Sequence, residues 1–542
     1  MDTNTMLSIN DNTAMDDARR TIYEEIQQCE RRILGLRSQL NRYTSVAKLP
    51  PEILLQIFAK LTEDGGLVDS IKCVPITHVS RQWRSLALDA PALWTNLSSI
   101  NLHWTIAMLE RSKGAPLTVL MDEKSYLVPV PILKHLSRVK SLTIENWSAG
   151  ELQKLHILIE NNASVAPQLE VLSISCNGTS PWVLPSTTFQ QTDRLNNLFL
   201  HDVHINWNHL PLLRNLMELR IESDWTGSQP TWRELITALN RMPTLKSLFL
   251  GAMLPMVPFE ATLDAIPAHL PNLESIVFGS VYTMRSVVTF LNQVKLPPDL
   301  KAFIISNFNT YYPNRGEVHE VYDAINRSLP DLCSKATYMY MRHWPWTGNF
   351  DINCFATLPD RFYDQLYDPN DETNPACIGF RLSYTSGGDR ITVVADAVNI
   401  LKLNHIRYLR IGEDIGDPEL HILLQYLPEL RIIQAFERAT VHLIQALNLI
   451  QPGGVREGAS ILTNLVEIRV CKDHDLIRQE DCVLTDDTWQ NLKAFLEHRQ
   501  SLQAGIHRLY IQDCRYVSKE MVEGLKKCVG DLCWDGICKE HR

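Results

Sequence analysis

One apolar pattern recurs through most of the chain. An apolar residue is followed three positions later by a second and, in most copies, two positions after that by a third, as in Leu245, Leu248 and Leu250. Alternation over the last positions is the period of a β-strand. The eleven copies begin at Val139, Leu169, Leu195, Leu216, Leu245, Leu273, Leu300, Ile406, Leu430, Leu465 and Ile506. The pattern therefore predicts eleven short strands, each burying one face.

The segments between these strands have helical patterns, as residues 232–239 do. Middle residues of successive copies between Leu142 and Phe303 lie roughly 21 to 30 residues apart. A single strand–helix unit cannot bury its apolar face, but stacked units share one core. The array resembles a degenerate leucine-rich repeat. The resemblance implies an α/β solenoid with parallel strands inside and helices outside.

A different pattern occupies residues 49–61. Pro50 and Pro51 suit a helix start, where a backbone N–H has no partner in any case, and Glu52 meets the positive helix end. The apolar residues that follow fall on one broad helix face. They are Ile53, Leu54, Ile57, Phe58 and Leu61. The segment is therefore predicted to be an amphipathic helix.

Two further blocks follow in order. They are Val79-Ser80-Arg81-x-Trp83-Arg84-x-Leu86-Ala87 and Pro91-x-Leu93-Trp94. Together with the helix at 49–61 they resemble an F-box, although the stretch 62–70 lacks the usual tight turn. The resemblance implies docking on a Skp-type adaptor and, through it, a cullin scaffold. The residues implied to form or support that interface are Leu49, Pro50, Ile53, Leu54, Ile57, Phe58, Leu61, Val79 and Trp83.

The resemblance implies a substrate-recruiting subunit of a Skp–cullin–F-box ubiquitin ligase. Such a chain needs no catalytic residue and no cofactor, and no phosphate-binding Gly loop, nucleophile elbow or His-Glu-x-x-His motif occurs in the sequence. The alternative is a protein-interaction scaffold without a ligase role. An enzyme with an irregular α/β domain is a third and weaker alternative. Binding to the adaptor is the experiment that best separates the first two.

Composition narrows the remaining choices. A net charge of −10 argues against binding to a nucleic-acid backbone. No apolar run reaches the length of a membrane span, and the polar, acidic N-terminus is unlike a secretory signal. We therefore expect a cytoplasmic or nuclear protein whose 12 cysteines are free.

The N-terminal region divides into two parts. Residues 1–15 are polar and are expected to be a disordered tail. Residues 16–44 are expected to form a helix with a heptad seam, which consists of Ile22, Ile26, Cys29, Ile33, Leu36, Leu40 and Tyr43. The seam fits either a dimeric coiled coil or a helix docked on its own F-box. We favour docking, and hence a chain that is monomeric apart from its complex.

The expected domains are an F-box at 45–96 and the solenoid at 97–542. An insertion rich in Trp, Phe and Tyr interrupts the array at about 342–378. It fits a partner-binding loop or a segment that buries its own rings. At the C-terminus, Cys528, Cys533, Cys538 and His541 could bind zinc, but their spacing matches no common site, which favours an apolar cap with free thiols.

The solenoid offers a candidate substrate surface. Strand positions that alternate with the buried ladder face the concave side. In the later repeats these positions hold aromatic residues and arginines, which are enriched at interface anchors. The candidates are Phe249, Tyr338, Tyr340, Arg342, Tyr408, Arg410, Arg469 and Tyr510. Because three arginines are present among the strands after residue 340, an acidic substrate segment is expected.

Overall fold

The structure is a computed structural model. It describes residues 3–63, 73–98, 102–122, 129–161, 165–178, 182–189, 191–207, 215–223, 229–256, 266–306, 315–344, 349–356, 377–383, 387–412, 415–450, 462–471, 485–512, 514 and 517–536. The chain forms two compact units, residues 1–171 and 172–542. The unit with the predicted F-box thus extends well beyond residue 96.

The first unit begins with a single long helix, α1 (Thr3–Arg42). Its backbone is helical from residue 3, where the sequence favoured a disordered tail to residue 15. The other elements of the N-terminal part are the 3-10 turn η1 (Val46–Lys48), α2 (Pro51–Glu63), α3 (Cys73–Val79), α4 (Arg81–Leu88) and the 3-10 turn η3 (Pro91–Trp94). Of the stretch 62–70, which lacks the usual tight turn of an F-box, residues 64–70 lie outside the described residues.

Local chemistry fixes the ends of these short helices. The N–H groups of Ile53 and Leu54 donate to the Pro50 carbonyl at the start of α2. Ser80 caps α4, its hydroxyl accepting the Trp83 N–H at 3.1 Å. The Trp94 indole is fully buried and donates to the Ala87 carbonyl at 2.8 Å. Trp94 therefore ties the closing turn to the end of α4.

The remainder of the first unit already alternates strands and helices. Its elements are β1 (Asn96–Ser98), α5 (Leu102–Arg111), β2 (Leu117–Met121), α6 (Pro129–Leu133), the 3-10 turn η4 (Leu136–Arg138), β3 (Val139–Trp147) and α7 (Ala149–Asn161). Strand β2 pairs in parallel with both β1 and β3. The parallel array thus starts two strands before the first recurring motif.

The second unit contains the remaining strands, of which β4 begins at the boundary. They are β4 (Val171–Cys176), β5 (Trp182–Leu184), β6 (Asn197–His201), β7 (Val203–Ile205), β8 (Glu218–Glu222), β9 (Ser247–Gly251), β10 (Ala268–His269), β11 (Ser275–Gly279), β12 (Val294–Lys295), β13 (Ala302–Ser306), β14 (Tyr338–Trp344), β15 (Asn349–Phe355), β16 (Ile378–Ser383), β17 (Tyr408–Ile411), β18 (Ile432–Phe436), β19 (Glu467–Cys471), β20 (Arg508–Gln512) and β21 (Asp531–Trp534).

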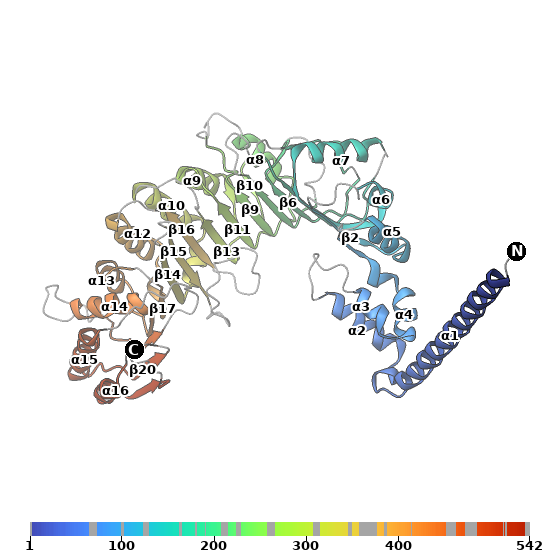
Figure 1. Ribbon diagram of the computed structural model, residues 1–542. Helices are drawn as coiled ribbons and strands as arrows, with labels where there is room; N and C mark the ends of the chain where they lie inside the picture. Colours follow the sequence, from blue (N-terminus) through green and yellow to red (C-terminus); the bar gives the residue numbers. More distant parts are fainter. Residues whose placement is uncertain are drawn as a thin grey trace. The chain divides into compact units, whose positions relative to one another are not determined.

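Helices of the second unit lie along one face of its strands (Figure 1). They are α8 (Trp232–Leu239), α9 (Met284–Gln293), α10 (Arg315–Ser328), α11 (Pro330–Ser334), α12 (Gly387–Ile400), α13 (Asp417–Gln425), α14 (Glu437–Leu449), α15 (Asp486–Ser501) and α16 (Lys519–Lys526), with the 3-10 turn η6 (Leu403–His405). Successive helices pack on one another, as α9 packs on α10 and α13 on α14. The predicted class, an α/β solenoid with helices outside, is confirmed.

Each of the eleven recurring motifs coincides with a strand, most of them beginning two residues before it, and their apolar residues form the buried ladder. Leu248, Ile276 and Phe303, for example, have no exposed surface and are neighbours on β9, β11 and β13. Parallel pairing runs from β6 through β8, β9 and β11 to β13, and from β17 through β18, β19 and β20 to β21. The motif thus predicts both the strands and the inward face.

The expected insertion belongs to the sheet. Strand β15 is antiparallel to both of its neighbours, β14 and β16. Strand β14 pairs in parallel with β17, and β16 with β13, so the spatial order is β13, β16, β15, β14, β17. Phe350 of the insertion is buried. Phe355 on β15 is half-buried, and its ring lies 5.6 Å from that of Tyr338. The aromatic residues at 346, 362, 363 and 367 lie outside the described residues.

Candidate binding surfaces

Helix α2 presents an apolar face to solvent. Ile53, Ile57 and Leu61 are 41%, 39% and 54% exposed, and Val79 at the end of α3 is 55% exposed. All four belong to the predicted adaptor interface. Large aliphatic side chains that recur on one helix face without cover are the usual anchors of a helix-in-groove contact. These residues are therefore the accessible aliphatic side chains of the predicted interface.

Two other predicted interface residues belong to the core of the small helical domain. Leu54 and Phe58 have no exposed surface. The Phe58 ring lies 4.8 Å from the ring of half-buried Trp83, centroid to centroid. Leu49 is half-buried and Pro50 exposed at the start of α2. Leu54 and Phe58 therefore belong to the core beneath the exposed face of α2.

The eight predicted substrate residues differ in how far their side chains are exposed to solvent. Five of them are at most 9% exposed: Phe249, Tyr338, Arg342, Tyr408 and Arg410. Only Tyr340, Arg469 and Tyr510 are half-buried. The three half-buried residues are therefore the accessible candidates for substrate contact. Buried side chains of this set pack across the strands on one another, as the Tyr338 and Tyr408 rings do at a centroid distance of 4.6 Å.

An ion pair that the sequence analysis did not identify lies within this face. Asp351 on β15 and Arg381 on β16 are directly opposite each other in the sheet. The guanidinium donates to both carboxylate oxygens at 2.6 Å, and both side chains are less than one-tenth exposed. Arg342 on β14 occupies the register position opposite Asp351 on the other side of β15. A buried charge needs a partner of opposite charge, because desolvation is costly.

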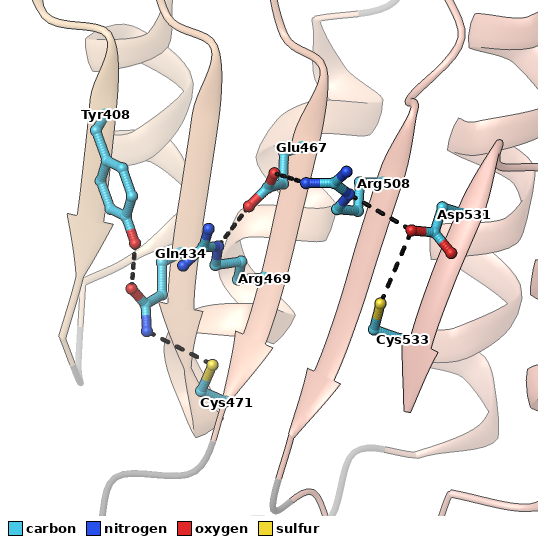
Figure 2. Close-up of polar contacts among 8 residues, drawn as sticks. All are labelled: Tyr408, Gln434, Glu467, Arg469, Cys471, Arg508, Asp531 and Cys533. Atoms are coloured by element: carbon cyan, nitrogen blue, oxygen red, sulfur yellow. Dashed lines mark hydrogen bonds and ion pairs between the residues drawn. The ribbon is translucent and has the colours of Figure 1, made fainter. Parts of the chain in front are cut away.

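Further polar contacts lie on the last five strands and form two groups, one of Tyr408, Gln434 and Cys471 and one that runs from Arg469 to Cys533 (Figure 2). Arg469 donates to Glu467 at 2.5 Å, and Arg508 lies 3.7 Å from the same carboxylate and 3.5 Å from Asp531. Burial is the largest single effect on the Arg469 charge and lowers its pKa. The hydrogen bond to Glu467 acts in the opposite direction, together with the charge of Glu467 and the nearby Tyr408 and Tyr510, and the sum of these effects raises the pKa of Arg469. Arg469 and Arg508 therefore have acidic partners within the chain, which weakens the case for an acidic substrate at this end of the sheet.

Aromatic rings and arginines alternate on the same face. The Arg410 guanidinium lies over Tyr340 at 5.3 Å and over Phe436 at 4.6 Å, and Arg469 lies 5.0 Å from the Tyr510 ring centre. Burial raises the pKa of Tyr338 and of Tyr408, so both phenols stay neutral at physiological pH. The half-buried candidates on this face are thus Tyr340, Arg469 and Tyr510, with the buried Arg410 packed between aromatic rings.

Metal and membrane alternatives find no support in the part of the chain described above. Among those residues, no group of three or more His, Cys, Asp or Glu side chains could hold a metal ion. Cys528 is buried and Cys533 half-buried, whereas Cys538 and His541 lie outside the described residues. No helix within the described ranges is long and apolar enough to cross a membrane.

Comparison with known families identifies the small helical domain. Residues 46–99 match the F-box-like family, so the chain contains an F-box-like domain. No curated protein matches the chain. One similar solved chain comes from the Rad7–Elc1 complex of yeast, at 12% identity and a TM-score of 0.29, covering 85% of this chain and 98% of that one. Another is the leucine-rich repeat-containing protein LegL7 of Legionella pneumophila, at 12% identity and a TM-score of 0.25, covering 76% and 87%.

Proposed function

We propose that this protein is the substrate-recruiting subunit of a Skp–cullin–F-box type ubiquitin ligase. The observation that carries the proposal is the uncovered apolar face of α2 within the F-box-like domain. F-box domains bind Skp-type adaptors, and the exposed side chains of Ile53, Ile57 and Leu61 would enter an apolar groove of the adaptor. The protein itself performs no chemistry in this role. It acts in the cytoplasm or nucleus.

The strands of the second unit would hold the substrate. Tyr340, Arg469 and Tyr510 lie in one row across β14 to β20, joined through Arg410 and Gln434. Their half-exposed side chains supply the aromatic and arginine anchors that dominate protein interfaces. The buried residues of the same face hold these anchors in position.

The decisive experiment measures binding to a purified Skp-type adaptor. Ile57→Asp with Leu61→Asp places two charges on the exposed face, and burying charge in an apolar groove costs several kcal/mol, so affinity should fall by at least about 100-fold. Gln56→Asp with Lys60→Asp makes the same change at exposed neighbouring positions of α2 and is the matched control. Phe58 is avoided because it is core.

Unchanged adaptor binding by the Ile57 and Leu61 variant, with its circular dichroism intact, would refute the adaptor interface. The competing function is a scaffold that holds a partner without ubiquitylation. A cullin captured together with the adaptor supports the ligase role. An adaptor complex that captures no cullin supports the scaffold.

A further inference from the structure

The seam of helix α1 has no cover. Its aliphatic side chains, Ile22, Ile26, Ile33, Leu36 and Leu40, are 47% to 69% exposed, and Tyr43 is 82% exposed. The sequence analysis favoured docking of this helix on the F-box of the same chain, and this exposure contradicts that expectation. An apolar seam that repeats every 3.5 residues fits the seam of another helix. Another copy of α1 offers the same seam.

The charged residues beside the seam are acidic in its first half and basic in its second half. In the heptad defined by the seam, Glu25 and Glu30 flank its first half and Arg32 and Arg37 its second half. In a parallel, in-register pair, a flanking residue meets the partner's residue five positions later. Glu25 would then face Glu30, and Arg32 would face Arg37. Both contacts are repulsive.

In an antiparallel pair, residues of opposite charge lie beside each other instead. The acidic half of one copy then runs beside the basic half of the other. Full overlap of the aliphatic seam places Ile22 opposite Leu40, Ile26 opposite Leu36 and Cys29 opposite Ile33. Every aliphatic layer is thereby covered, and opposite charges line its edges.

We propose that two copies of this chain associate through α1 as an antiparallel two-stranded coiled coil. Because the F-box-like domain follows the end of α1 in the sequence, the two domains of the dimer would emerge at opposite ends of the paired helices. At 1.5 Å per residue, the overlap from Ile22 to Leu40 separates these ends by about 30 Å. One dimer would therefore present two adaptor surfaces.

The first test is the mass of the full chain in solution, measured by light scattering. The wild type should be a dimer, and Ile26→Asp with Ile33→Asp should make it a monomer. Gln27→Asp with Leu34→Asp places the same charges one residue along, outside the seam, and should leave the dimer intact. A monomeric wild type, or equal loss in both variants, would overturn the proposal.

The second test fixes the orientation. In a Cys29→Ser background, chains carrying Ile22→Cys are mixed with differently tagged chains carrying Leu40→Cys and then oxidised. The antiparallel pair should give a disulfide between the two tagged chains and none between two Ile22→Cys chains. Cross-linking of Ile22→Cys chains to each other would show a parallel pair and refute the proposed orientation. Adaptor binding should be unaffected in each variant, which separates this proposal from the F-box interface.

Discussion

Asp351 and Arg381 form a buried ion pair, and burial determines what the loss of either side chain would cost in stability. Their bidentate contact lies inside the face that would otherwise be open to a partner. Removing one member of a buried pair leaves an unpaired charge, whereas replacing both with apolar residues of similar volume is often close to neutral. The pair is therefore expected to matter for specificity of strand order more than for net stability.

This expectation gives a measurable contrast. Asp351→Ala should lower the free energy of unfolding by about 3 to 5 kcal/mol, because Arg381 is left buried without its carboxylate. The double variant Asp351→Leu with Arg381→Met should recover most of that loss. Denaturant unfolding followed by fluorescence measures both. An equal loss in the single and double variants would contradict this account of the pair.

Alternation along the strands predicted which residues lie at matching register positions, as Tyr340 and Arg410 do. It did not predict which of them remain accessible, because that depends on neighbours brought together from distant parts of the chain. Arg410 stacks on Tyr340, some 70 residues earlier, and Asp351 pairs with Arg381 across an insertion. On α2, by contrast, helical periodicity alone could not separate Phe58 from Ile57, because both lie on one broad apolar stripe.

At the scale of elements, the start of α7 shows how one short motif fixes a helix end. The Glu151 carboxylate accepts from the backbone N–H of Ser148 and from its hydroxyl, both at 2.8 Å. The Ser148 hydroxyl in turn accepts the Glu151 N–H. These contacts hold the pKa of Glu151 below its usual value, the backbone hydrogen bond being the largest cause. Helix α8 begins with the same arrangement at Thr231 and Glu234.

The sign of the pH effect follows from this lowered pKa. The ionised Glu151 carboxylate contributes its full stabilisation at pH values above the pKa that Glu151 has in the unfolded chain. This stabilisation is lost as the pH falls through the lower pKa that Glu151 has in the folded protein. Glu151→Gln should therefore melt at a lower temperature than the wild type near about pH 7, and the gap should close as the pH approaches about 3. Melting curves across this range check the prediction. A gap that widens in acid would show that the carboxylate does not stabilise α7.

Some strands could be predicted from the local sequence and others could not. The eleven recurring motifs were predicted as strands because each carries its own local spacing. Strand β14 carries the same spacing with weaker residues, Ala336, Met339 and Met341, all buried. The order in which β14, β15 and β16 enter the sheet was not predictable, since it rests on pairing between strands distant in the sequence.

At the scale of the whole molecule, the two candidate surfaces lie in different compact units. Their functions should therefore respond to mutation independently. Tyr340→Ala, Arg469→Ala and Tyr510→Ala together remove the accessible anchors of the second unit, and truncation of such anchors typically costs 1 to 4 kcal/mol each by rough estimate. Proteins captured by the wild type should be lost, while adaptor binding stays unchanged.

Mass spectrometry of captured proteins measures this loss. The matched control changes exposed side chains away from the strands, Tyr426→Ala, Leu449→Ala and Leu502→Ala. Capture unaffected by the first triple variant but reduced by the control would place the substrate surface on the helical side. Burial excludes Arg342, Tyr408 and Arg410 from such a test, because their replacement would disturb the sheet itself.

The insertion of β16 and β15 between β13 and β14 has a consequence for biosynthesis. In an ordinary solenoid each strand docks on the one made just before it. Here, when β14 leaves the ribosome, neither β15 nor β17 exists, and β13 keeps an open edge until residues 378–383 have been made. An unpaired edge is a template for pairing with other chains. During synthesis, the edge of β13 is therefore open to pairing with other chains from the time β13 is made until β16 is made.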